Sequence, residues 1–220
     1  MLQRTPEPDL MNGAEQALAY ARSDFSEPHN AFVAHFQRLF PDFAGGHVLD
    51  LGCGPADIGI RLCEALPAVA LTGVDGAAAM LELGREAIER HGLAQRMVLE
   101  QRYLPDATLP QAAYDAAISN SLLHHLNDPG VLWQTLRHGA KAGAPVLVMD
   151  LMRPVTLAQA EHLKQCYAAD APPVLQRDFY HSLLAAYRPD EIRDQLAAAG
   201  LSRWRVGAVS DRHFIVWGNC

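Results

Sequence analysis

The spacing of hydrophobic residues along the chain predicts strands and helices in alternation. Short apolar runs predict strands at 47–51, 69–74, 97–101, 115–120 and 144–151. Apolar residues at helical spacing predict helices at 57–66, 77–91 and 129–143. Strands that alternate with helices of this length indicate βαβ units around a parallel sheet.

The flanking segments depart from this alternation. Residues 13–40 predict one helix, and residues 152–188 are mostly helical in pattern and rich in aromatic residues, arginine and histidine. A helix at 189–200 precedes strands at 201–209 and 213–217, which a tight turn joins. We therefore expect one α/β domain, a three-layer αβα sandwich with a helical lid. Its seven-stranded sheet is mostly parallel, with one antiparallel strand near the edge.

Composition narrows the class of protein. The chain has 220 residues, of which 50% are hydrophobic and 20% charged, so it can bury a core. The net charge of −7 disfavours general nucleic-acid binding, which needs positive charge against phosphates. The four cysteines form no CxxC pair, which is typical of reduced thiols in a cytoplasmic protein. No apolar run predicts a signal sequence or a membrane span.

The strongest chemical signal is a glycine-rich turn after the first predicted strand. The strand ends at Asp50, and Gly52 and Gly54 let the backbone bend sharply and approach a ligand closely. The helix that follows offers free N–H groups to an anion. A dinucleotide-binding turn would have a small residue at position 57, but Asp57 would repel a pyrophosphate there. No Gly-Lys-Ser/Thr follows, which excludes a P-loop.

A nucleoside ligand without phosphate fits this turn, and S-adenosylmethionine (SAM) is such a ligand. Its carboxylate can meet the turn, and Asp50 can balance its ammonium group. Asp75 ends the second predicted strand, 21 residues after Gly54, where a carboxylate can accept both ribose hydroxyls.

These motifs resemble the class I SAM-dependent methyltransferases over residues 46–151, and the strand order is similar over 201–217. The turn at 50–54 is similar to the family's first motif, and Asp75 to its ribose-binding acid. Residues 114–126 are similar to the segment where the fourth strand meets the active site. Residues 141–144 are similar to the turn before the fifth strand.

Two positions depart from the family pattern. Ala56 stands where a third glycine is common, and Ala is also small. No acid clearly follows the third strand to contact the adenine amine, so we expect Arg102 and Tyr103 to make that contact.

The resemblance implies a division of the domain and a set of cofactor contacts. Residues 1–45 form the lid, 46–151 the SAM-binding core, 152–188 an insertion over the acceptor site, and 189–220 the final helix and strands. SAM is the methyl donor and S-adenosylhomocysteine the product. The predicted cofactor-binding residues are Asp50, Gly52, Cys53, Gly54, Asp75, Gly76, Met80, Arg102, Tyr103, Asn120, Ser121 and Tyr20. Tyr20 and Phe25 either close over the cofactor or are ordinary packing aromatics.

The expected activity is methyl transfer to an oxygen, nitrogen or sulfur atom of a small molecule by in-line displacement. The Asn-Pro-Pro-Tyr/Phe variant, which accompanies methylation of planar amino groups, is absent at 119–122. The candidates for a catalytic base are His124, His181 and Tyr180. His124 and His125 lack partner ligands at suitable spacing, so no metal site is predicted.

The acceptor itself stays open at this stage. Arg153, Arg177 and Arg188 suggest an anionic or zwitterionic acceptor, or else a solvated helical face paired with neighbouring acids. Two other functions remain as alternatives: methylation of tRNA or protein, and a non-catalytic SAM-binding regulatory module with a blocked acceptor pocket. The oligomeric state is not predicted.

Overall fold

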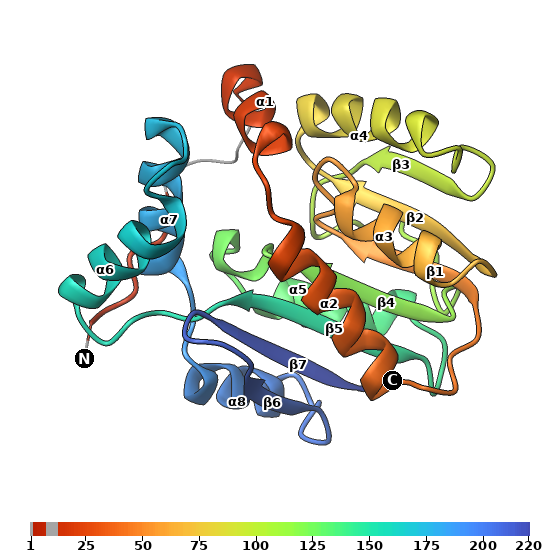
Figure 1. The fold of residues 1–220 in the computed structure, drawn as a ribbon. Helices are drawn as coiled ribbons and strands as arrows, with labels where there is room; N and C mark the ends of the chain where they lie inside the picture. The colour runs from red at the N-terminus through yellow and green to blue at the C-terminus, as the bar shows by residue number, and fades with distance from the viewer. Residues whose placement is uncertain (1, 8–12) are drawn as a thin grey trace.

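The backbone forms one seven-stranded sheet in the order β3-β2-β1-β4-β5-β7-β6 (Figure 1). A computed structural model describes residues 2–7 and 13–220. Within these residues, β7 alone runs antiparallel to its neighbours, as the sequence predicted. The strands are β1 Gly46–Leu51, β2 Val69–Asp75, β3 Met97–Gln101, β4 Ala116–Asn120, β5 Pro145–Leu151, β6 Arg205–Ala208 and β7 His213–Asn219.

Helices cover both faces of the sheet and complete the predicted three layers. On one face, α2 (Ser26–Leu39), α3 (Asp57–Ala65) and α4 (Ala78–Arg90) bury apolar residues such as Phe32 and Phe36 against the strands. On the other face, α5 (Gly130–Gly139) and α8 (Pro189–Ala198) pack around Trp133. Apolar side chains on both faces of the central strands explain why those strands are continuous apolar runs in the sequence.

Three predicted boundaries were wrong, each because a contact that the sequence pattern does not show divides or shortens the element. The helix predicted at 13–40 is two helices, α1 (Ala14–Arg22) and α2, because the carboxylate of Asp24 accepts a hydrogen bond from Ser26 N at 2.8 Å and starts α2. Helix α5 ends at Gly139 because Ala140 pairs with Tyr114 beside the sheet. Strand β6 starts only at Arg205 because Trp204 N is held in a turn by Leu201 O.

The insertion (residues 152–188), helix α1 and the N-terminal residues 2–7 lie near the carboxyl ends of the parallel strands. The insertion forms a pair of packed helices, α6 (Leu157–Ala168) and α7 (Pro173–Ala185), directly after β5 (Figure 1). Helix α1 packs against α4 and α7. A short arm, residues 2–7, runs along the insertion, with Leu2 N donating to Val155 O and Thr5 N donating to Leu184 O. None of the described helices is long and apolar enough to cross a membrane.

Candidate active site

A cavity of about 1040 Å³ opens at the carboxyl ends of the parallel strands, between the sheet, α1, α2 and the α6–α7 pair. Strands β1 and β4 are neighbours, and the chain reverses its order across the sheet at this point. In open α/β sheets, ligands bind at such a switch point, outside the carboxyl ends of the strands. The fold therefore brings the residues that end β1, β2 and β4 to one cavity.

The glycine turn after β1 forms the floor of the cavity. Gly52 takes a φ of +73°, and a Cβ on it would lie 2.8 Å from the Cβ of Leu122. Gly54 takes a φ of +51°, and a Cβ on it would meet nothing within 4 Å. The first position thus needs glycine for packing, whereas the second leaves open space above the backbone.

Asp75 ties this turn to the start of α4. Its Oδ2 accepts a hydrogen bond from Gly54 N at 2.9 Å, and its Oδ1 accepts one from Ala77 N at 2.8 Å. Its carboxylate is partly exposed and lines the cavity, so it can also accept hydrogen bonds from a ligand.

Two buried oxygens in the wall lack partners among the described residues: Asp50 Oδ2 and Asn120 Oδ1. Asp50 is 1% exposed, and burial together with the charge of Asp75 raises its pKa to about 7. Buried acceptors without donors are costly, so both oxygens call for a donor from a ligand. Next to them, Ser121 holds a φ of +55°, an unfavourable backbone conformation for a non-glycine residue at the cavity edge.

Aromatic residues of the N-terminal helices cover one side of the cavity. The rings of Tyr20 and Phe25 stack with centroids 4.6 Å apart, and both line the cavity. Burial and nearby carboxylates, Asp57 first, raise the pKa of Tyr20 to about 12. Asp57 itself is paired: burial raises its pKa, but His29 and Arg61 outweigh that effect and lower it to about 2.

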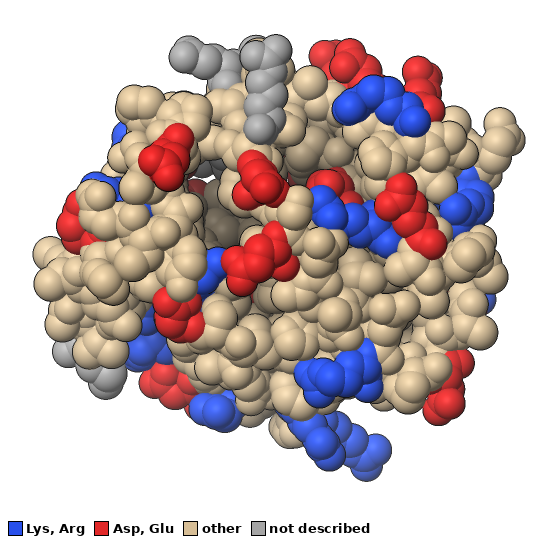
Figure 2. Space-filling model, in the orientation of Figure 1, with Lys and Arg blue, Asp and Glu red and all other residues tan. Residues whose placement is uncertain are grey.

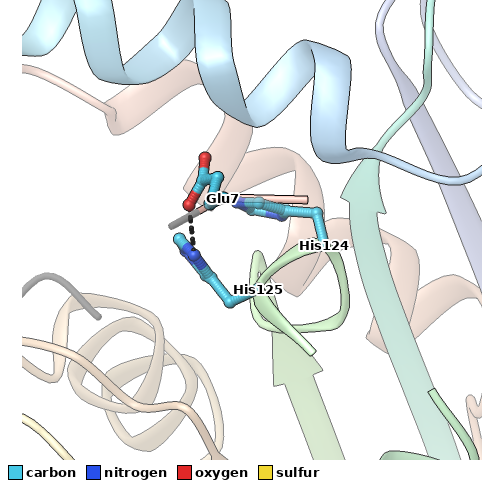
Figure 3. Close-up of side chains that lie close together, drawn as sticks. All are labelled: Glu7, His124 and His125. Atoms are coloured by element: carbon cyan, nitrogen blue, oxygen red, sulfur yellow. Dashed lines mark ion pairs between the residues drawn. The ribbon is translucent and has the colours of Figure 1, made fainter. Parts of the chain in front are cut away.

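On the opposite side, the short helix η1 (Leu123–His125) places two histidines against two carboxylates. His124 Nδ1 lies 2.6 Å from Asp150 Oδ1. Figure 3 shows the other pair, in which His125 Nδ1 lies 2.6 Å from Glu7 Oε2. Burial lowers the pKa of His124, but Asp150 outweighs it and the pKa is raised. Burial raises the pKa of Glu7, yet His125, His124 and Ser182 outweigh burial and lower it to about 2.

The structure brings together most of the predicted site residues. The residues that line this one cavity are Asp50, Gly52, Cys53, Gly54, Asp75, Met80, Asn120, Ser121, Tyr20 and His124. They come from β1 and the turn after it, from β2, from β4 and the residue after it, and from α1, α4 and η1.

Five predicted residues lie outside the cavity wall: Gly76, Arg102, Tyr103, Tyr180 and His181. Arg102 is paired with Glu100 and Asp106, and Tyr103 is 58% exposed and packs beside Gly76. Tyr180 and His181 of α7 also lie elsewhere: Lys164 covers the ring of Tyr180, and His181 is exposed. The helical rotation of α7 turns Asp178, Phe179 and Ser182 toward the cavity instead.

Sequence reasoning missed Glu7 and Asp150 and left Arg212 and His213 unassigned. Asp150 lies near the end of β5, so the rule that ligands bind at the carboxyl ends of strands could have indicated it. Glu7 carries no such signal, because its partner His125 is 118 residues away (125 − 7).

The comparisons with known proteins agree on one family. A family model described as a methyltransferase domain matches residues 48–145. The chain is 27% identical over 172 residues to a demethylmenaquinone methyltransferase of Porphyromonas gingivalis, a match that covers 75% of this chain and 70% of that protein. Residues 48–145 are a methyltransferase domain, and these similarities support a class I SAM-dependent methyltransferase.

Two further similarities concern a second relative and a solved structure. It is 26% identical over 166 residues to a 27-O-demethylrifamycin SV methyltransferase of Amycolatopsis mediterranei, covering 74% of this chain and 56% of that protein. A crystal structure of a SAM-dependent methyltransferase from Aquifex aeolicus has the same fold, with a TM-score of 0.66 and 19% identity. That likeness covers 94% of this chain and 98% of the other.

The cavity of this methyltransferase fits the cofactor of its family. The open space above Gly54 accepts a ligand that a Cβ would exclude, and Asp50 and Asn120 present acceptors that lack donors. SAM carries an ammonium group and ribose hydroxyls, which are donors of the kind these oxygens lack.

Substituting Gly54 with Ala should weaken SAM binding by about tenfold or more without unfolding the protein, because the new Cβ occupies the open space. Gly92→Ala is the matched control. Gly92 also has a positive φ, +67°, and open space around it, but it lies outside the cavity. Calorimetric titration and thermal unfolding should show similar losses of stability in both variants and a loss of affinity in Gly54→Ala alone. Equal SAM affinities in the two variants would contradict the assigned floor of the site.

Proposed function

We propose that this methyltransferase transfers a methyl group from SAM to an oxygen, nitrogen or sulfur atom of a small molecule by in-line displacement. The supporting observation is one continuous cavity of about 1040 Å³ that holds the cofactor residues and extends past Asn120 to α6 and α7. Binding sites for small molecules usually measure about 300–1,000 Å³. A cavity at the upper end of that range suits two ligands side by side.

The acceptor side favours a molecule with a sizeable apolar part. Its wall includes Met149, Leu151, Leu175 and Phe179. The relatives named for demethylmenaquinone and for 27-O-demethylrifamycin SV support a small organic acceptor of this kind. A hydroxyl is our preferred nucleophile among the three, because one relative is named for the O-demethyl form of its product.

The arginines that suggested an anionic acceptor do not line the cavity. Arg153 and Arg188 pair with Glu191, and Arg177 pairs with Asp178. A carboxylate on the acceptor would therefore depend on Arg212, which does line the cavity. That guanidinium lies 3.4 Å from the centroid of the Tyr167 ring and is paired with Asp211 and Glu27.

The charge around the cavity disfavours tRNA as the acceptor. Figure 2 shows acidic side chains on the surface around the hollow. Asp24, Glu27, Asp170 and Asp178 all line the cavity. A polyanion approaching this opening would meet like charges, which screening reduces but does not reverse.

Residues of this chain bind the cofactor, orient it and exclude water from the site. When bound, SAM supplies an electrophilic methyl group on a sulfonium centre. Asp75 and the glycine turn fix the position of the cofactor, and Tyr20, Phe25 and α7 exclude water. Alignment of nucleophile and methyl group contributes up to about 7–11 kcal/mol in such reactions. Of the three predicted catalytic residues, we retain His124, since Asp150 holds it at the acceptor side of the cavity.

Incubation with SAM and a panel of quinols, phenols and hydroxylated macrocycles should release S-adenosylhomocysteine and give a product heavier by one methylene unit. Nuclear magnetic resonance of the product identifies the methylated atom. Asp75→Ala serves as the control that is impaired in cofactor binding. Methyl incorporation into tRNA or protein, with none into small molecules, would contradict the proposal. SAM binding without turnover on any acceptor would favour the regulatory module.

A further inference from the structure

We propose that Glu7, His124 and His125 form a binding site for one divalent transition-metal ion, of the Zn²⁺ or Co²⁺ type, at the acceptor side of the cavity. One ligand atom from each residue lies within 4.8 Å of the other two (Figure 3). Two imidazoles and one carboxylate are a ligand set that such ions prefer. Cation binding at this site does not depend on the proposed methyl acceptor.

The three side chains of the cluster are shielded from solvent and lie close together. His124 is 3% exposed, and Glu7 and His125 are largely buried. The imidazole rings of the two histidines lie 4.1 Å apart, centroid to centroid. Bringing two imidazoles and a carboxylate together away from water is costly unless a shared cation or proton compensates them.

Asp150 orients the first imidazole in the way that metal sites require. It lies 2.6 Å from His124 Nδ1, so His124 Nε2 is the nitrogen left for a metal ion. The carboxylate is itself fixed, since its Oδ2 accepts a hydrogen bond from Leu123 N at 2.7 Å. Metal-binding histidines characteristically have such a carboxylate on the other ring nitrogen, where it sets the tautomer and increases basicity.

The N-terminal arm delivers the third ligand. Arg4 anchors the arm: its Nε donates to Ala185 O at 2.6 Å and its Nη2 donates to His124 O at 2.9 Å. Ser182 of α7 donates to Glu7 Oε1 at 2.6 Å and leaves Glu7 Oε2 directed at His125. The carboxylate is therefore held from the arm, the insertion and η1 together.

The position of the site suggests what a bound ion does. His124 and His125 line the cavity, so an ion bound by them has an open side toward the acceptor. A Lewis acid there lowers the pKa of an acceptor hydroxyl that contacts it, which makes the oxygen a better nucleophile. This role would explain how the site promotes loss of the acceptor's proton, and it rests on the proposed function.

The test uses the 220-residue protein, stripped with a chelator and then titrated with Zn²⁺ by calorimetry and with Co²⁺ by visible absorption. Glu7→Gln removes the carboxylate ligand but keeps an amide oxygen for Ser182. Glu64→Gln is the matched control, because the exposed Glu64–His91 pair, 2.7 Å apart, repeats the carboxylate–imidazole contact outside the three-ligand cluster. Thermal unfolding confirms that each variant is folded.

Wild type and Glu64→Gln should bind one ion per chain with the same affinity, and Glu7→Gln should bind it at least about tenfold more weakly. Asp150→Asn should weaken binding about 10- to 100-fold through the loss of His124 orientation. Equal binding by wild type and Glu7→Gln would overturn the proposal, as would a wild type that binds no ion or binds it only at exposed histidines. These measurements need no methyl acceptor, so their failure is separate from failure of the proposed function.

Discussion

Replacing Asp75 with alanine is expected to weaken SAM binding by about 1–3 kcal/mol, or about 5- to 150-fold in Kd, because ribose hydroxyls lose their acceptor. The structure adds a second reason. The same carboxylate accepts hydrogen bonds from Gly54 N and Ala77 N, so its removal also releases the glycine turn that forms the cavity floor. Calorimetric titration with SAM measures the effect, and thermal unfolding separates it from a loss of fold.

Asp115→Ala is the matched control for this substitution. Its carboxylate also accepts a backbone hydrogen bond, from His47 N at 2.9 Å, but it lies outside the cavity and pairs with Lys141. This variant should lose some stability and keep the wild-type affinity for SAM. A folded Asp75→Ala protein with wild-type affinity would show that the cofactor site has been assigned to the wrong cavity.

Replacing Asp50 with asparagine is expected to stabilise the ligand-free protein above pH 7 while it weakens SAM binding. Burial and Asp75 raise the pKa of Asp50 to about 7 in the folded protein, from an ordinary value of 3.8. Folding therefore favours the protonated acid, and this contribution disappears as the pH rises from about 4 to 7. At pH 8 the ionised carboxylate costs the folded state at most about 4 kcal/mol, a cost that asparagine avoids.

The pH dependence of cofactor binding tests the same charge in the complex. An ammonium group binds better to a carboxylate than to a neutral acid, so SAM affinity of the wild type should rise from pH 5.5 to 7.5. Asp50→Asn should bind SAM more weakly at pH 7.5 and show little change over this range. Denaturant unfolding at pH 8 and pH 4 completes the comparison, because it gives the difference in the free energy of unfolding between the two pH values for each protein. An asparagine variant that is less stable than wild type at pH 8 would contradict the assignment of an uncompensated buried charge.

Much of the fold could be predicted because local pattern and topology agree in the core. Each central strand is a continuous apolar run, and both faces of the sheet are covered by helices. The errors lie where a single contact ends an element. The carboxylate of Asp24 divides the N-terminal helix, and the pairing of Ala140 with Tyr114 ends α5 early. Periodicity carries no information on such contacts.

The two sides of the cavity differ in how far sequence alone could describe them. The sequence predicted that Asp50, Asp75 and Asn120 would meet, because they end, or nearly end, neighbouring parallel strands, whose carboxyl ends lie at one edge. The opposite side, toward α6 and α7, could not be described from the sequence in this way. Its residues come from α7, the N-terminal arm and η1, whose rotation and docking depend on contacts across more than half of the chain.

The sequence by itself determined the parallel sheet, the bend after β1 and the acids that flank it, because strand periodicity and glycine conformation are local properties. Only the tertiary structure decided that Tyr180 and His181 lie outside the cavity and that Glu7 meets His125. Packing of α6 and α7 on the sheet sets which face of each helix is buried, and no short stretch of sequence encodes that orientation.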